Sequence, residues 1–280
     1  MRSSSHGLLD EIEGRADDSN AGNPALVGEI LRAEEERRAL EFIFILAVGL
    51  VAGTLSGIVG FGSSIMLMPV LVIVFGPVQA VPIMGIAAIM ANLSRIAVWW
   101  REVDWRACAA YSATGVPAAA LGAATLLSLP PRIVEGALGV FFLLMVPARR
   151  WLAARGLRLR LAHLAAIGAP IGYLTGIVVT TGPITVPIFL AYGLVKGAFI
   201  ATEAAASFAV YLGKIAVFGS FGALPWNVVL DGLITGSSLM AGAFLAKRFV
   251  LKLEPGQFRL LMEGLMLVSG AAMLWTAAVS

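Results

Sequence analysis

Charged residues, cysteine and histidine are all scarce in this sequence of 280 residues, and each shortage excludes a class of site. The single cysteine, Cys108, rules out an intramolecular disulfide and a cysteine-based metal cluster. The two histidines, His6 and His163, lie far apart in the sequence, which argues against a histidine-rich metal site. We therefore expect neither a metal nor a cofactor.

Motifs of catalysis are also missing. The sequence contains no His-Glu-x-x-His zinc motif and no Gly-x-x-x-x-Gly-Lys-[Ser/Thr] phosphate-binding loop. The few carboxylates inside apolar segments are not paired at helical spacing, as a general acid and base would be. We expect a protein that is not an enzyme and that does not itself hydrolyse ATP.

Hydrophobic residues are abundant and make up 59% of the chain, whereas charged residues make up 13%, about half the usual ~25%. A soluble domain of this length could not bury so much apolar surface. Runs such as 133–146 are apolar on every face, which favours helices over alternating strands. The composition predicts an all-α, polytopic helical membrane protein in contact with the lipid bilayer. The net charge of +3 comes from basic residues in short loops, so we expect no nucleic-acid partner.

Polar stretches divide the chain into four parts. Residues 1–40 form a polar tail with nine acidic residues and five arginines, and 24–41 is either solvated or a polar surface helix. Residues 41–148 form a first transmembrane repeat, 149–162 a basic cytoplasmic linker, and 163–280 a second repeat. Each repeat holds five apolar segments, so we expect about eight to ten membrane segments in all.

The two halves share residues in the same order, which indicates an internal repeat. The pairs 119 residues apart are Gly53 and Gly172, Gly57 and Gly176, and Arg95 and Lys214. If each half makes an odd number of crossings, eleven basic residues fall in loops on one side, with only Arg132 and Lys196 opposite. This asymmetry is typical of cytoplasmic loops and predicts that the second repeat is inverted relative to the first.

Glycine and proline interrupt an apolar stretch at matching places in each half, GIVGFGSSIMLMP at 57–69 and GIVVTTGPITVP at 176–187. A helix that restarts inside the bilayer presents unpaired N–H groups and partial positive charge, which suit an anion. Broken helices at matching positions of inverted repeats form the substrate site in many transporters. In the alternative interpretation, the Gly-x-x-x-Gly spacing only allows close helix packing. The predicted anion-binding residues at the breaks are Gly60, Gly62, Ser63, Ser64, Thr180, Thr181 and Gly182.

Polar residues inside the later apolar segments extend this candidate site. Arg95 and Lys214 either extend to the membrane interface or attract an anion from symmetric positions. Asn92 and Tyr211 precede them by three residues and share their helix faces. Glu203 is our candidate for a coupling proton, or else it lies at the interface.

The pattern Gly53-x-x-x-Gly57-x-x-Gly60-x-Gly62 followed by Pro69, with a weaker copy after the basic linker, resembles the TauE/SafE family of sulfite and organosulfonate exporters. The resemblance covers roughly residues 42–279 and implies a bacterial inner-membrane protein that moves small anions. The chain departs from the family at Ser63 and Ser64, where further glycine is expected, and at 179–181. The added hydroxyl groups can alter the choice of substrate, so the resemblance supports an anion transporter better than it supports sulfite in particular.

Two functions fit these observations. The first is a secondary transporter, by resemblance an exporter, that moves a small sulfite-like or sulfonate-like anion by alternating access, with proton coupling or the membrane potential as the driving force. The alternative is a channel for small anions or neutral solutes, which would require a continuous pore. The exact substrate, the direction of transport, the side of the tail and a homodimer all stay open.

Overall fold

The computed structural model describes residues 24–59, 63–156, 158–178 and 181–249, together with 263, 264, 267, 268, 270, 271, 274, 275 and 278. Within these residues the secondary structure is helical and contains no strand, which confirms the all-α fold. The elements are α2 (Pro24–Val59), α3 (Ser63–Trp99), the 3-10 turn η1 (Trp100–Glu102), α4 (Trp105–Leu127), α5 (Pro131–Ala154), α6 (Leu161–Ile177), α7 (Gly182–Tyr192), α8 (Lys196–Ser220) and α9 (Trp226–Phe249).

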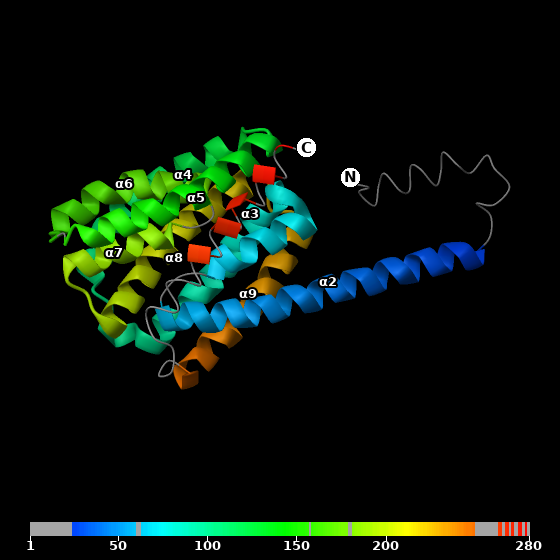
Figure 1. The fold of residues 1–280 in the computed structure, drawn as a ribbon, viewed down its shortest axis with the longest axis horizontal. Helices are drawn as coiled ribbons and strands as arrows, with labels where there is room; N and C mark the ends of the chain where they lie inside the picture. The colour runs from blue at the N-terminus through cyan, green and yellow to red at the C-terminus, as the bar shows by residue number, and fades with distance from the viewer. Residues whose placement is uncertain are drawn as a thin grey trace. The chain divides into compact units, whose positions relative to one another are not determined.

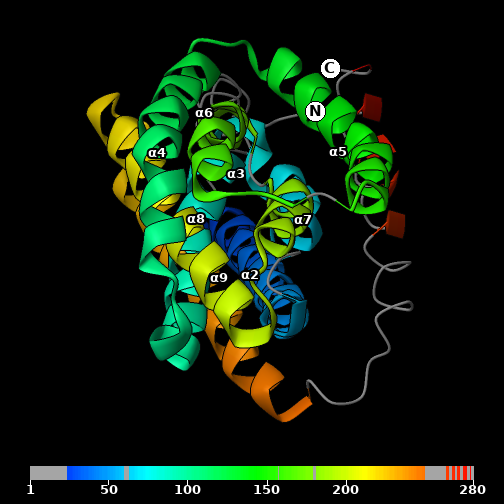
Figure 2. The ribbon, with the colours of Figure 1, turned by 90° about the vertical axis from the view of Figure 1, so that its left-hand side faces the viewer.

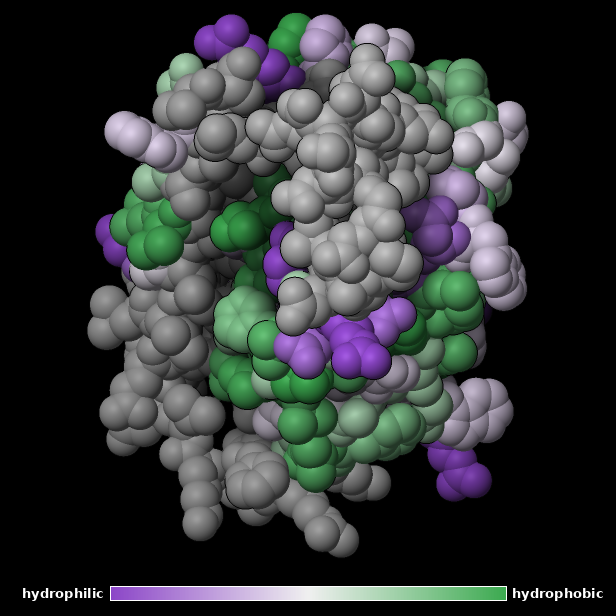
Figure 3. Space-filling model, turned by 90° about the vertical axis from the view of Figure 1, so that its right-hand side faces the viewer, coloured by the Kyte–Doolittle hydropathy of each residue, from purple (hydrophilic) through white to green (hydrophobic). Residues whose placement is uncertain are grey.

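Several of these helices are long and apolar enough to cross a membrane. Within the described part of the chain there are five such segments, Leu31–Gly57, Val78–Glu102, Trp105–Leu127, Gly197–Ser220 and Trp226–Ala246. Three shorter apolar helices accompany them, at Met66–Gly76, Leu161–Ile177 and Gly182–Tyr192. Hydrophobic side chains lie next to one another on the outer surface, as they must where a protein meets lipid (Figure 3). The prediction of a polytopic membrane protein is confirmed.

The chain divides into two units, Met1–Phe44 and Ile45–Ser280. The described residues of the first unit, from Pro24 onward, are helical, so the part of the predicted tail that the structure describes is not irregular chain. The basic linker also differs from the prediction, because α5 continues to Ala154 and takes in the first residues of 149–162. All the packing and all the site geometry below belong to the second unit.

Close packing between helices of different halves organises the second unit. Helix α6 lies along α4 (Figures 1 and 2). A Cβ atom added at Gly172 of α6 would lie 2.3 Å from the carbonyl oxygen of Gly115 of α4. In the first half, a Cβ at Gly53 of α2 would lie 2.4 Å from the carbonyl oxygen of Leu239 of α9. The glycine pairs therefore sit where two backbones touch, which confirms the packing interpretation of Gly-x-x-x-Gly.

A short helix follows the break in each half. In the second half α7 has 11 residues, about 16 Å at ~1.5 Å per residue, too short for a ~30 Å hydrocarbon core. Gly193, with φ of 107°, ends α7, and α8 starts at Lys196. In the first half α3 starts at Ser63 and kinks at Gly76, with φ of 73°. Both glycines adopt backbone angles that other residues rarely reach, so each one separates a short helix from a long one.

Helix α7 runs back toward the end of the molecule at which α6 begins. The amide of Leu159, just before α6, donates to the carbonyl of Ala191 at the end of α7, at 2.9 Å. The start of α8 therefore lies at the same end as the basic linker, and Gly197 lies against Glu102 there. Our placement of Lys196 on the opposite side was wrong, because a pair of helices that enters and returns leaves the chain on its original side. The inverted orientation of the halves stays a prediction.

Candidate anion-binding site

The core of the second unit contains a set of polar side chains that we call the Arg95 cluster. Its members come from three helices: Asn92 and Arg95 of α3, Thr185 of α7, and Glu203 and Ser207 of α8. Arg95 is 8% exposed and Glu203 is 3% exposed, although both are ionisable side chains. Both side chains are therefore buried inside the protein, and their depth in a membrane stays a prediction.

The hydrogen bonds of the cluster centre on the Glu203 carboxylate. Nη1 of Arg95 donates to Oε2 of Glu203 at 3.4 Å, and Nη2 of Arg95 donates to Oδ1 of Asn92. The other carboxylate oxygen, Oε1, accepts from the hydroxyl groups of Ser207 at 2.9 Å and Thr185 at 3.2 Å. Hydroxyl and guanidinium donors therefore satisfy both oxygens of a carboxyl group that is buried inside an apolar bundle.

Helical spacing brings these side chains to one place. Asn92 and Arg95 are three residues apart on α3, and Glu203 and Ser207 are four residues apart on α8, so each pair shares a helix face. Two tyrosines complete the surroundings. Tyr111 of α4 interacts electrostatically with Glu203, and Tyr211 of α8 interacts with Arg95.

The side chain of Lys214, from α8, contacts the C-terminal end of α6, next to the second break. Its side chain is fully buried, and its ammonium group donates to the carbonyl oxygens of Thr175 at 2.9 Å and Val178 at 3.0 Å. The last carbonyls of a helix have no partners within the helix and carry partial negative charge, which a cation satisfies. The Phe218 ring lies 5.5 Å from the same ammonium nitrogen. Lys214 thus binds the backbone beside the second break from within the protein core and does not extend to the surface of the protein.

Thr181 is the N-cap residue of α7. Its carbonyl oxygen accepts from the amides of Ile184 at 2.8 Å and Thr185 at 3.0 Å. Its hydroxyl makes no capping bond and instead pairs with the hydroxyl of Thr175, 2.6 Å away. Pro183 is the second residue of α7, where its missing N–H group leaves no helical hydrogen bond unmade.

The predicted residues at the breaks fall into two groups. Ser63 and Ser64 are buried at the start of α3, and Gly182 is buried at the start of α7. Gly60, Gly62 and Thr180 lie outside the described residues.

Polar contacts connect Arg95 to Lys214 through the second break. From Arg95 the path passes to Glu203 and then to Thr185, whose hydroxyl also reaches the Gly182 carbonyl at 3.2 Å. It continues through Thr181 and the Thr175 hydroxyl, and the Thr175 carbonyl accepts from Lys214. Sequence reasoning missed Thr175 and Thr185. The available signal was their distance of six and four residues from Thr181, before and after the break.

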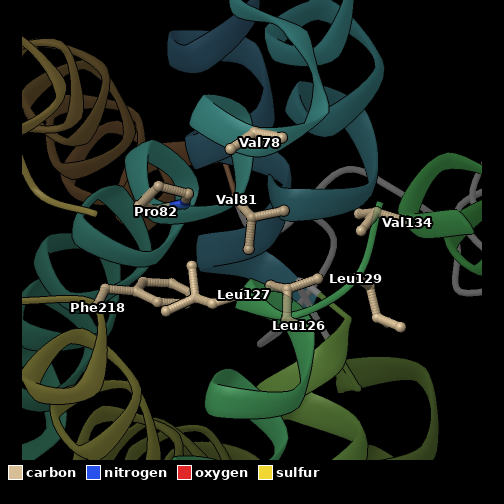
Figure 4. A pocket seen from close by; sticks show the side chains of 8 residues that line it. All are labelled: Val78, Val81, Pro82, Leu126, Leu127, Leu129, Val134 and Phe218. Carbon is tan, nitrogen blue, oxygen red and sulfur yellow. The ribbon is translucent and has the colours of Figure 1, made fainter. Parts of the chain in front are cut away.

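A separate cavity of about 50 Å³ lies between the ends of several helices (Figure 4). Its lining is hydrophobic and consists of Val78, Val81, Pro82, Leu126, Leu127, Leu129, Val134 and Phe218. It includes none of the predicted site residues, and it offers no charged or hydrogen-bonding side chain to an anion. The polar path from Arg95 to Lys214 is therefore the better candidate for a functional site.

Long apolar helices, a short helix that turns back and buried cations together define a multi-pass membrane protein of the transporter class. The family described as "Sulfite exporter TauE/SafE" matches residues 45–273, most of the chain. The chain belongs to this family, whose members are membrane transporters and not enzymes. Membership implies a small anionic substrate and contact with the lipid bilayer. No curated protein and no solved structure matches the chain.

Proposed function

We propose that this protein is a secondary transporter that moves a small anion, sulfite or an organosulfonate, out of the cell across the bacterial inner membrane. One observation carries the proposal: two buried cations, Arg95 and Lys214, joined by a polar path through the break between α6 and α7. Ionisable residues inside a membrane-spanning bundle are costly, and they usually mark the path of an ion or substrate.

The chemistry of this path suits an oxyanion. Arg95 contributes a planar set of donors that matches two oxygens of one group. Asn92, Tyr211 and Thr181 bring further polar groups close to the two cations. Irregular backbone at membrane depth persists only inside protein or beside water, so the break is where a substrate would exchange its water shell for protein donors. We assign the remaining predicted residues, Gly60, Gly62, Ser63, Ser64, Thr180 and Gly182, to the same substrate site.

Alternating access and proton coupling are parts of the proposal. The two halves would exchange exposure of the site between the two sides of the membrane. Glu203 would carry the coupled proton, because neutralising it removes the negative charge closest to an anion bound at Arg95. The family name supports sulfite and sulfonates as the substrate class.

A ligand panel tests the substrate class. The purified protein would be melted in detergent with sulfite, sulfate, methanesulfonate or acetate. An anion that binds the folded protein and is present at a concentration of 100 times its dissociation constant should stabilise the folded state by about 2.7 kcal/mol. Saturable counterflow of the same labelled anion in proteoliposomes would support a transporter. Conductance far above carrier turnover would instead indicate the channel alternative, and no response to any anion would contradict both.

A further inference from the structure

The guanidinium group of Arg95 does not use all of its donors. Nη2 donates to Asn92 and Nη1 donates to Glu203, whereas the buried Nε atom has no hydrogen-bond partner among the described residues. The contact with Glu203 is also long, 3.4 Å against the usual ~2.7–2.9 Å for a bond between two charged groups. Arg95 is therefore incompletely paired in the structure described here.

Glu203 is held more closely by its hydroxyl donors than by the arginine. Its Oε1 atom accepts from Ser207 at 2.9 Å and Thr185 at 3.2 Å, while its Oε2 atom lies at the longer distance from Arg95. A carboxylate in this position can separate from the guanidinium and keep its contacts to α7 and α8. Another anion can therefore replace the Glu203 carboxylate as the partner of Arg95.

We propose that Glu203 and the transported anion compete for Arg95, and that one proton and one monoanion therefore move together. This inference rests on the proposed function and specifies its stoichiometry. Because an inward proton gradient opposes the outward movement of a proton, such a symport exports the anion only down the anion's own concentration gradient. When Glu203 takes up a proton, the guanidinium loses its counter-ion. An oxyanion then bonds to Nε and to a terminal nitrogen of Arg95. A sulfonate or a hydrogen sulfite ion presents two or more equivalent oxygens to these parallel donors and carries the single charge that Arg95 balances.

The charges that face Glu203 support a monoanion. Arg95 of α3 is its cationic neighbour, Thr185 of α7 is uncharged, and Tyr111 of α4 and Tyr211 of α8 are neutral phenols near pH 7. The pair is neutral when both residues are ionised, and it is neutral again when protonated Glu203 lies beside an anion on Arg95. An unbalanced charge on this pair is expensive, so these two neutral states of the pair are the favoured ones. Lys214 donates to the carbonyls of Thr175 and Val178 and is not part of the pair.

Electroneutral transport distinguishes this mechanism from other forms of coupling. The probe is methanesulfonate, whose single negative charge does not titrate near neutral pH. In proteoliposomes with the wild-type protein, a gradient of one pH unit should drive accumulation of about tenfold. An imposed membrane potential should leave the accumulation ratio unchanged. In Glu203→Gln the anion should move without a proton, so a potential of about 100 mV should change the ratio by about 50-fold.

Glu263→Gln is the matched control, because Glu263 is also a buried carboxylate paired with an arginine, Arg150, outside the Arg95 cluster. It should remain coupled to the pH gradient like the wild type. Wild-type accumulation that follows the potential, or a Glu203→Gln protein that stays coupled to pH, would overturn the competition and the role of Glu203 as proton carrier, and would leave transport of the anion itself intact. If Glu203→Gln does not fold, the wild-type measurement decides alone. Absence of counterflow of both methanesulfonate and sulfite in the wild type would overturn the proposed function as well.

Discussion

The ammonium nitrogen of Lys214 lies 3.0 Å from the carbonyl oxygen of Val178, the last described residue before the second break. Lys214 belongs to α8 and Val178 caps the C-terminal end of α6, so this contact fixes the end of one helix to the side of another. The carbonyl of Thr175 accepts from the same group. A movement of α8 along α6 must therefore either break these bonds or carry the break with it.

Lys214→Met tests this role, because methionine is also unbranched but has no charge or donor. The substitution leaves the carbonyls of Thr175 and Val178 without this donor, at about 1–3 kcal/mol each, offset in part by relief of a buried charge. We expect a net loss of about 2 kcal/mol, measured as a lower melting temperature in detergent. Arg101→Met removes an exposed cation and should change stability by less than about 0.5 kcal/mol. Equal effects of the two substitutions would contradict the assignment.

The Arg95–Glu203 pair predicts strongly non-additive substitutions. Arg95→Met leaves a buried carboxylate without its cation, and Glu203→Gln leaves a buried guanidinium without its anion, so each should cost about 3–5 kcal/mol. The double variant removes both charges and should be more stable than either single variant. A double-mutant cycle of unfolding free energies measures the coupling. Additive single effects would show that the 3.4 Å contact contributes no pairing energy.

Thr185 links the charge of Glu203 to the start of α7, since its one hydroxyl lies 3.2 Å from both Oε1 of Glu203 and the carbonyl of Gly182. Thr185→Val preserves the shape of the side chain and removes the donor, whereas Thr185→Ser keeps the donor. We expect the valine variant to shift the pH profile of methanesulfonate counterflow and the serine variant to retain the wild-type profile. If Thr185 had only a structural role, both variants would show slower counterflow at every pH, and the shape and midpoint of the pH profile would stay as in the wild type.

Ser207→Ala provides the comparison for Thr185, because Ser207 also donates to Oε1 of Glu203, at 2.9 Å, but does not contact the break. It should move the pH profile in the same direction as Thr185→Val. The valine variant alone should also weaken anion binding, because it alone disturbs the first turn of α7. Identical binding in the two variants would show that Thr185 acts on Glu203 only.

The helices and the positions of the breaks could be predicted from local features of the sequence. Apolar runs of sufficient length form the membrane helices, and α2 and α6 end at Val59 and Ile177, inside the predicted glycine-containing breaks. The ends differ more: α5 continues past the predicted end of the repeat at 148 to Ala154, because Arg, Trp, Leu and Ala are all acceptable in a helix. Lys196 was placed on the wrong side because local pattern does not reveal a helix pair that turns back.

The contacts within the site could not be predicted in the same way. Arg95 and Glu203 are 108 residues apart in the sequence, and only the packing of α3 against α8 brings them together. Each residue was conspicuous alone, as a charge inside an apolar run, but nothing in either segment specified the partner. Lys214 matches Arg95 by position in the repeat, yet it bonds to backbone carbonyls while Arg95 bonds to a carboxylate. Matching positions in a repeat therefore did not imply matching contacts.

Gly172→Ala tests whether the contact between α6 and α4 positions the second break. The added methyl group would lie 2.3 Å from the Gly115 carbonyl oxygen and 2.7 Å from its Cα atom, and backbone cannot move aside as a flexible side chain can. We expect α6 to shift away from α4, with a loss of about 3 kcal/mol in stability and weaker methanesulfonate binding. Gly136→Ala of α5 is the control, since a Cβ there meets nothing within 4 Å. It should be neutral or stabilise the helix by up to about 1 kcal/mol. If Gly172→Ala melts like Gly136→Ala and binds the anion normally, close contact at Gly172 does not determine the geometry of the break.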